Sequence, residues 1–160
     1  MQKEGLFSRY AIGGGIASLF YIEPITTFDL DIFILPPESS DLIFSMSPIY
    51  TWLEKKGYIS QKEQVVIEGV PVQLIPVYNE LVKDAVHDSI EKKYKDTTTF
   101  VLRSEYLVAI MIQTNRSKDR ERLDRFLKEA EISLSKLNDI LIRYNLKVAY
   151  DTFRGAHLGK

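Results

Sequence analysis

The stretch AIGGGIASLFYIEPITTFDLDIFIL, residues 11–35, contains two features that lower the stability of an ordinary fold. Three consecutive glycines at 13–15 interrupt a short apolar segment, and glycine loses more backbone freedom on folding than any other residue. Asp29 and Asp31 then interrupt the apolar pattern of a strand, where a buried carboxylate without a partner is unfavourable. Two features that each lower stability, within one short stretch, indicate that these residues serve a functional site.

The two aspartates have the spacing of a metal-binding pair. Side chains in a strand alternate between its two faces, so Asp29 and Asp31 lie on one face, about 7 Å apart. Two carboxylates so placed repel each other unless a cation lies between them. Mg²⁺ prefers such oxygens and keeps room for water and phosphate ligands, and Mn²⁺ takes the same ligand types. We therefore predict Asp29 and Asp31 as metal ligands, with surface charges on an edge strand as the alternative.

The glycine run predicts a phosphate-binding turn. Glycine lets the backbone approach a ligand closely, and free N–H groups at the start of a following helix bind anions. Ser18 adds a hydroxyl donor shortly afterwards. A phosphate-binding turn beside a metal-binding acid pair is what nucleoside triphosphate chemistry requires. A plain turn is the alternative for this run, and the candidate phosphate-binding residues are Gly13, Gly14, Gly15 and Ser18.

Composition narrows the class of protein. The 160 residues include no cysteine and carry a formal net charge of −1 at pH 7. Disulfides and thiolate–metal sites are therefore excluded, and bulk charge attracts the chain to neither DNA nor membranes. No apolar run approaches the roughly 18 residues of a membrane helix, and the first ten residues lack the apolar segment of a signal peptide. We expect a cytoplasmic protein with no membrane partner.

The pattern along the chain predicts an α/β (α+β) fold, with a mixed sheet flanked by helices. We place this core at 1–102 and a helical C-terminal part, packed on it, at 103–160; the two can form one domain. Expected strands cover 10–12, 26–35, 64–67, 72–77 and 99–102. Expected helices cover 16–21, 47–56, 80–90, 105–113 and 118–131, with a helical turn at 41–46 and a last helix from about 133.

A basic segment opens the helix at 118–131. Such a run is usually a solvated helix face with ion pairs between successive turns. Yet Lys118 and Arg116 stand at a helix start, where they can hold a triphosphate. Asp119 falls on the buried stripe and needs a partner, so we interpret it as a structural anchor. The cations of the segment are Arg116, Lys118, Arg120, Arg122 and Arg125.

The same residues resemble the signature of the nucleotidyltransferases related to DNA polymerase beta. That signature is an apolar residue, a Gly-Gly or Gly-Ser pair, a short spacer and Asp-x-Asp in a strand; here 16–28 form the spacer. Thr27 matches a threonine of the minimal bacterial branch, and Ile25 replaces a common arginine. The segments VPVQLIPVYNELVKDAV (70–86) and VLRSEYLVAIMIQTNRSKDRERLDRFL (101–127) also resemble this branch, which includes nucleotidyltransferase-like toxins of abortive-infection toxin–antitoxin systems.

The resemblance implies a nucleotidyltransferase-like fold, Mg²⁺ or Mn²⁺ as cofactor, an NTP as substrate, and a role for Thr27 in nucleotide binding. It also implies Asp29 and Asp31 as catalytic residues. Active members carry a third carboxylate on a later strand, as general base and metal ligand. The matching position is Gln73, whose amide can ligate a metal weakly but cannot accept a proton. Glu68, at the expected hairpin turn, is a candidate substitute.

Two functions of different classes follow. The first is transfer of a nucleoside monophosphate from Mg–NTP to an acceptor hydroxyl, with release of pyrophosphate; the acceptor is an RNA end, a protein or a small molecule. The second is a non-catalytic nucleotide-binding module, or a toxin–antitoxin component with an antitoxin protein as partner. The absent third acid favours the second. A purely structural domain that binds no nucleotide is the third interpretation.

Overall fold

The computed structural model describes residues 1–37, 44–61 and 64–157, and the first half of the turn expected at 41–46 lies outside them. The strands are β1 (Arg9–Ile12), β2 (Leu30–Leu35), β3 (Ser60–Gln61), β4 (Gln64–Ile67), β5 (Val70–Pro76), β6 (Ile90–Tyr94) and β7 (Thr97–Val101). They form one mixed sheet in the order β3-β4-β5-β2-β1-β7-β6. The helices are η1 (Gln2–Glu4), α1 (Gly14–Ser18), α2 (Ser47–Lys55), α3 (Glu80–His87), α4 (Ser104–Thr114), α5 (Ser117–Glu129), α6 (Leu134–Arg143) and α7 (Lys147–His157).

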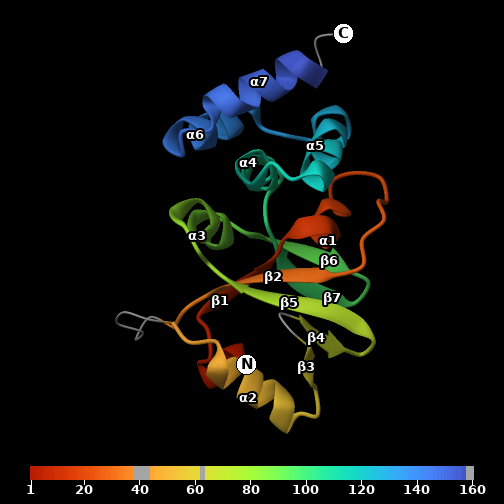
Figure 1. Ribbon diagram of the computed structural model, residues 1–160, viewed down its shortest axis with the longest axis vertical. Coiled ribbons are helices and arrows are strands. Elements are labelled where there is room, and N and C mark those ends of the chain that lie inside the picture. The colour runs from red at the N-terminus through yellow and green to blue at the C-terminus, as the bar shows by residue number, and fades with distance from the viewer. Residues whose placement is uncertain (38–43, 62–63, 158–160) are drawn as a thin grey trace.

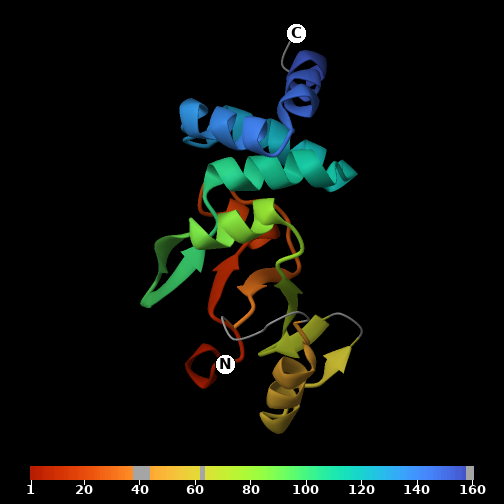
Figure 2. The same cartoon turned by 90° about the vertical axis from the view of Figure 1, so that its left-hand side faces the viewer.

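Helices cover both faces of the sheet (Figure 1). One buried cluster joins Phe33 and Val101 of the sheet to α3 and to all four C-terminal helices. A second cluster packs Ile34 and Val72, on the opposite face, against Leu53 of α2. Turned by 90°, the molecule shows the C-terminal helices stacked at one end and α2 at the other (Figure 2). The sheet is therefore the middle of three layers.

The central strand β2 is shorter than the sequence pattern predicts. It begins at Leu30, whereas the pattern predicts a strand from residue 26. Its antiparallel partner β1 ends at Ile12, which lies opposite Ile32. Its parallel partner β5 reaches slightly further, and the first pair between the two strands is Leu30 with Val72. Residues 26–28 have no neighbouring strand, and an extended segment without hydrogen-bonded neighbours is not a strand. Asp29 consequently precedes β2, and Asp31 lies within it.

Helix α4 joins the two parts of the chain. Nearly all of its residues are buried, as its apolar sequence predicts. A helix without a polar face must be enclosed, and the same buried cluster contains Ala11 of β1, Leu107 of α4 and Phe126 of α5. The segment 1–102 and the helices that follow it therefore share one continuous core.

Two elements near α3 differ from expectation. Asn79 caps the helix as predicted, since its side chain accepts a hydrogen bond of 2.9 Å from the Val82 amide. The helix ends at His87 instead of 90, and the chain enters β6, which the sequence analysis missed. The β6–β7 turn contains Lys95 at φ 51°, where glycine or asparagine usually signals such a hairpin. The final helix α7 was also not predicted.

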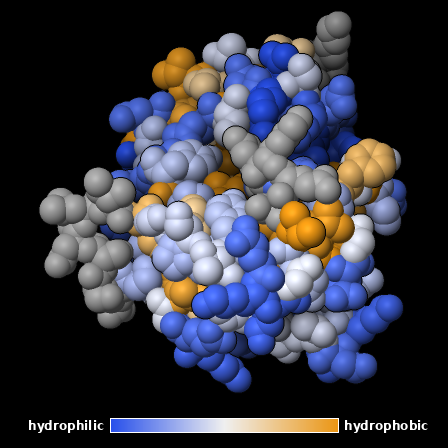
Figure 3. Space-filling model, turned by 60° about the horizontal axis from the view of Figure 1, so that its bottom comes forward, coloured by the Kyte–Doolittle hydropathy of each residue, from blue (hydrophilic) through white to orange (hydrophobic). Residues whose placement is uncertain are grey.

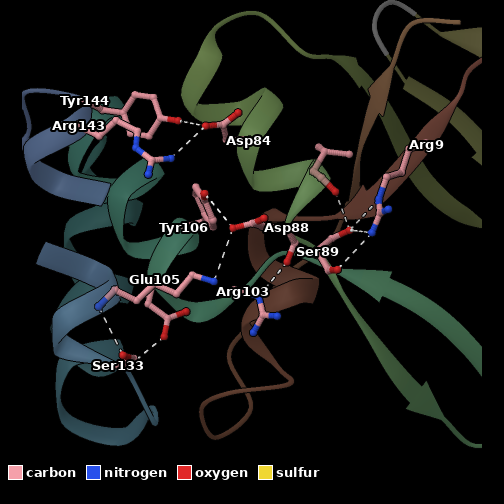
Figure 4. Close-up of polar contacts among 12 residues, drawn as sticks. Arg9, Asp84, Asp88, Ser89, Arg103, Glu105, Tyr106, Ser133, Arg143 and Tyr144 are labelled. Carbon is pink, nitrogen blue, oxygen red and sulfur yellow. Dashed lines mark hydrogen bonds and ion pairs between the residues drawn. The ribbon is translucent and has the colours of Figure 1, made fainter. Parts of the chain in front are cut away.

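Polar contacts fasten α3 to the C-terminal helices (Figure 4). The Tyr144 hydroxyl donates to Asp84, and the Tyr106 hydroxyl donates to Asp88 over 3.2 Å. Burial, together with the charge of Asp88, raises the pKa of Tyr106, which keeps that phenol protonated as a donor. On the other side of α4, the Ser133 amide donates to Glu105 over 3.0 Å. These bonds hold α4, and with it one wall of the site described below.

None of the helices in the described ranges is both long and apolar enough to cross a bilayer. Figure 3 brings the α2 end of the molecule forward and shows mainly hydrophilic residues with small apolar areas among them. Exposed apolar side chains near that end include Ile59, Val66 and Val70.

Candidate functional site

A cavity of about 200 Å³ lies where β2 and β5 meet α1, α4 and α5. Its charged residues come from two distant parts of the chain. Asp29 and Asp31 come from the segment around β2, whereas Asp119 and the cations come from α5 and the residue before it. Its apolar wall comes from the sheet and from α4. The lining residues with charged or amide side chains are Asp29, Asp31, Gln73, Arg116, Lys118, Asp119 and Arg122.

Asp29 and Asp31 both line this cavity. Burial raises the pKa of Asp31 above the usual aspartate range, and the charge of Asp29 raises it further. The cations Lys118, Arg116 and Arg122 act in the opposite direction on the same carboxyl. This is the electrostatic pattern of two carboxylates that share a site, and a divalent cation relieves it.

The glycine turn packs tightly against β2. Gly14 has φ 56°, and a Cβ at this position would overlap the carboxylate of Asp31. The Gly13 amide donates a hydrogen bond of 2.9 Å to the backbone carbonyl of Asp31. The corresponding Cβ position of Gly13 is filled by Phe33. The glycines therefore allow the turn to touch the strand, and Gly14 is the member of the run that lines the cavity.

Two other residues predicted to bind phosphate, Ser18 and Thr27, instead contact the glycine turn. Ser18 lines the cavity but is 1% exposed, and its hydroxyl donates to the Gly14 carbonyl over 3.0 Å. Thr27 packs against the space beside Gly15 and does not line the cavity. Both residues support the shape of the glycine turn in this structure.

Asp119 anchors the start of α5. It is 1% exposed and accepts hydrogen bonds from Thr114 Oγ1 at 2.7 Å and from Arg116 Nε at 2.6 Å. Burial opposes the ionised form, but the bonds from Arg116 and Thr114 outweigh it and lower the pKa of Asp119. A second bond of 3.1 Å completes a two-pronged contact with the Arg116 guanidinium. The anchor role expected for Asp119 agrees with these contacts, and Arg116 is oriented by them.

Two cavity residues were not predicted as part of the site. Arg122 was treated as one member of a charged face, yet it lines the cavity and its buried Nε has no acceptor among the described residues. It lies four positions after Lys118, so helix periodicity was the signal that could have placed both on one face. Tyr78, which follows β5, is 55% exposed, and burial of its hydroxyl raises its pKa. No local sequence pattern marks Tyr78.

The position of the third acid is occupied by Gln73. It pairs with Asp31 across the parallel strands β5 and β2, and its side chain lines the cavity. Glu68 lies in the β4–β5 turn, where it accepts a hydrogen bond of 3.0 Å from Tyr58, and it does not line the cavity. Across the described ranges, no group of three or more histidine, cysteine, aspartate or glutamate side chains gathers as a metal site. Two carboxylates and an amide oxygen form an all-oxygen donor set, which fits Mg²⁺ or Mn²⁺ with open positions for a ligand.

Comparison with known proteins identifies the fold. No family model matches the chain, and no curated protein matches its sequence. An antigenic nucleotidyltransferase-like protein from Paracoccidioides brasiliensis matches 94% of this chain and 88% of its own, with a TM-score of 0.55 and 15% identity. The solution structure of the antibiotic-resistance factor ANT(2'')-Ia matches 98% of this chain and 91% of its own, with a TM-score of 0.51 and 12% identity. The chain therefore has a nucleotidyltransferase-like fold, which confirms the predicted fold class.

Proposed function

We propose that this protein transfers a nucleoside monophosphate from an NTP to an acceptor hydroxyl and releases pyrophosphate. The observation that supports this function is the meeting of Asp29 and Asp31 with Lys118 in one cavity of a nucleotidyltransferase-like fold. In this reaction the acceptor oxygen forms a bond to the α-phosphorus, and the bond from that phosphorus to the bridging oxygen of pyrophosphate breaks. Positioning and charge neutralisation supply most of the catalysis in such transfers.

Asp29 and Asp31 would hold Mg²⁺ or Mn²⁺, with the Gln73 amide oxygen beside them. When bound, a divalent ion polarises a phosphoryl oxygen and lowers the pKa of a hydroxyl that it contacts. Burial and, after it, the charge of Asp29 raise the pKa of Asp31, so a cation bound between the two carboxylates would stabilise the folded chain. The same two carboxylates thereby set where the reacting phosphorus must lie.

The chain's other residues bind and orient the nucleotide. Lys118 places an ammonium group in the cavity with the charge needed by a phosphate chain. The turn at Gly14 lies directly against the Asp31 carboxylate, which leaves its backbone free of a side chain beside the position where a phosphate would bind. The apolar wall, which includes Ile110 and Met111 of α4, excludes water from part of the cavity and strengthens these interactions. Because Gln73 accepts no proton, the proton of the acceptor hydroxyl must pass to another base, either one of the cavity carboxylates or solvent water.

A specific observation favours a second candidate. With glutamine at position 73, only Asp29 and Asp31 are available to a metal, because Asp119 is bonded to Arg116 and no larger acid cluster gathers within the described ranges. A site with weakened metal chemistry but intact phosphate recognition is a nucleotide-binding module. In that case a partner protein, such as an antitoxin, would supply the regulation.

Calorimetric titration with each NTP, in the presence of Mg²⁺ or Mn²⁺, combined with an assay for pyrophosphate release, separates the two functions. The acceptors to test are RNA ends, hydroxyl side chains of proteins and small hydroxyl compounds. The Asp29→Asn/Asp31→Asn double variant should lose both binding and release, whereas Asp139→Asn, an exposed change on α6, should retain them. Binding without pyrophosphate release supports the module, and absence of NTP binding by the wild-type protein refutes both functions.

A further inference from the structure

The cations of α5 differ in whether the protein already neutralises them. Arg116 pairs with Asp119 at 2.6 Å, Arg125 with Glu129 at 2.9 Å, and Lys128 with Asp124 at 2.7 Å. Over the described ranges, Lys118, Arg120 and Arg122 form no such ion pair. Of these three, Lys118 and Arg122 line the cavity that contains the aspartates.

Lys118 and Arg122 also border a second space. A surface groove of about 410 Å³ adjoins the cavity, and its walls are α5 and the segment before β2. Because both side chains line the cavity and the groove, they stand where the two meet. Residues four apart on a helix have Cβ atoms about 5–6 Å apart, so two neighbouring anionic groups can be held between them. The other groove residues are Pro24, Ile25, Thr26, Glu121 and Arg125.

The strongest sign of a ligand is the Arg122 guanidinium. Its Nε is buried without an acceptor in the described part of the chain. A terminal nitrogen of the same group lies 3.2 Å from the position that a Cβ on Gly15 would occupy, so the guanidinium lies against the glycine turn. Buried charged donors are normally hydrogen-bonded, because an unmet donor is costly. Because Arg122 lines both the cavity and the groove, an oxygen anion bound where they meet would supply an acceptor that the described residues do not.

We propose that Arg122, together with Lys118, binds the oligophosphate chain of a nucleoside triphosphate and directs its end from the aspartate cavity into the adjoining groove. A guanidinium binds phosphate oxygens through two parallel N–H donors, and the ammonium of Lys118 adds a second charge one turn away. Arg122 thus takes the phosphate contact that the sequence suggested for Ser18, whose hydroxyl is bonded to Gly14. The identity of the nucleotide rests on the proposed function; the recognition of linked phosphates does not.

Titration with inorganic tripolyphosphate in metal-free buffer tests this anion site without a nucleotide. Arg122→Gln should weaken binding at least tenfold. Arg120→Gln is the matched control, because Arg120 lies on the same helix and lines only a separate depression, with Ser117, Glu121 and Asp124. That control should bind within about twofold of the wild-type protein, because one exposed charge outside the site contributes little. Equal losses in the two variants, or no tripolyphosphate binding by the wild-type protein, would overturn the proposal.

A second measurement is made on the wild-type protein, so it remains valid even if the Arg122→Gln variant does not fold. The Nε–H resonance of Arg122, assigned by its disappearance in Arg122→Lys, should shift on addition of tripolyphosphate to the wild-type protein. An unshifted resonance at saturating ligand would overturn the proposal. If tripolyphosphate binding requires Arg122 but no NTP yields pyrophosphate, the anion site stands and the proposed transfer reaction fails.

Discussion

Replacing Gly14 with alanine tests the close contact between the glycine turn and Asp31. Gly14 has φ 56°, and an added Cβ would overlap the Asp31 carboxylate. The left-handed backbone costs alanine about 1 kcal/mol. Overpacking adds about 1–3 kcal/mol, because Asp31 or the strand that carries it must move.

The sum is a loss of about 2–4 kcal/mol in the free energy of unfolding, which for a protein of this size lowers Tm by roughly 4–16 °C. The matched control is Gly57→Ala. Gly57 has φ 88° with nothing within 4 Å of an added Cβ, so that variant carries the backbone cost alone. We expect it to lower Tm by about 2–4 °C.

The assays are thermal unfolding without metal and calorimetric titration with Mg–NTP. Gly14→Ala should weaken nucleotide binding at least about tenfold, since it displaces a predicted metal ligand. Gly57→Ala should bind as the wild-type protein does. If the two variants have the same Tm and both bind normally, the turn and Asp31 are not in contact and the site is built differently.

Three further substitutions address the carboxylates and Gln73. Asp119→Asn removes the acceptor of bonds from Thr114 and Arg116 and should lower the free energy of unfolding by about 2–3 kcal/mol at pH 7. Because folding lowers the pKa of Asp119, this wild-type advantage is complete above the ordinary aspartate pKa near 4 and disappears as the pH falls through the folded value. Asp31→Asn should raise Tm at pH 7 without metal, because burial and Asp29 raise the pKa of Asp31 and its charge opposes folding; the difference should close as the pH falls through that raised pKa. Gln73→Glu adds a third carboxylate opposite Asp31, so it should lower Tm without metal and increase the Tm gain on adding Mg²⁺.

Chemical unfolding curves from pH 3 to 8 check Asp119→Asn, and thermal unfolding over the same pH range checks Asp31→Asn. An Asp119→Asn variant with the wild-type pH dependence contradicts the assigned carboxylate network. A lower Tm for Asp31→Asn at pH 7 shows that the charge of Asp31 is compensated in the folded protein. For Gln73→Glu, a Tm that responds to Mg²⁺ no more than in the wild-type protein argues against a metal between β2 and β5.

The parts of the site that arise from local sequence could be predicted. Gly14 and Asp31 belong to one short stretch, and the strand pattern alone indicated that the two aspartates belong together. Gln73 was identified through a resemblance, and the structure pairs it with Asp31; its role at the site stays a prediction. The contacts of Asp119 agree with the anchor expected from its place on the buried stripe of α5.

What could not be predicted depends on contacts between distant segments. The strand predicted at 26–35 begins too early. Its first residue depends on how far the neighbouring strands β1 and β5 extend beside it, which no local sequence pattern reveals. Arg122 resembled any other solvated arginine, since its burial arises from packing against the turn at Gly15. The chemistry assigned to Ser18 was a property of its residue type, while its actual partner is a backbone carbonyl one turn earlier.

The division of the cavity between β2 and α5 has a consequence for protein synthesis. A ribosome produces Asp29 and Asp31 well before Lys118 and Arg122. A nascent chain halted between these points carries the acids without the cations that face them. A translation product that stops before α5 therefore has only the acidic half of the ligand site, and both halves are present only in chains that extend through Arg122.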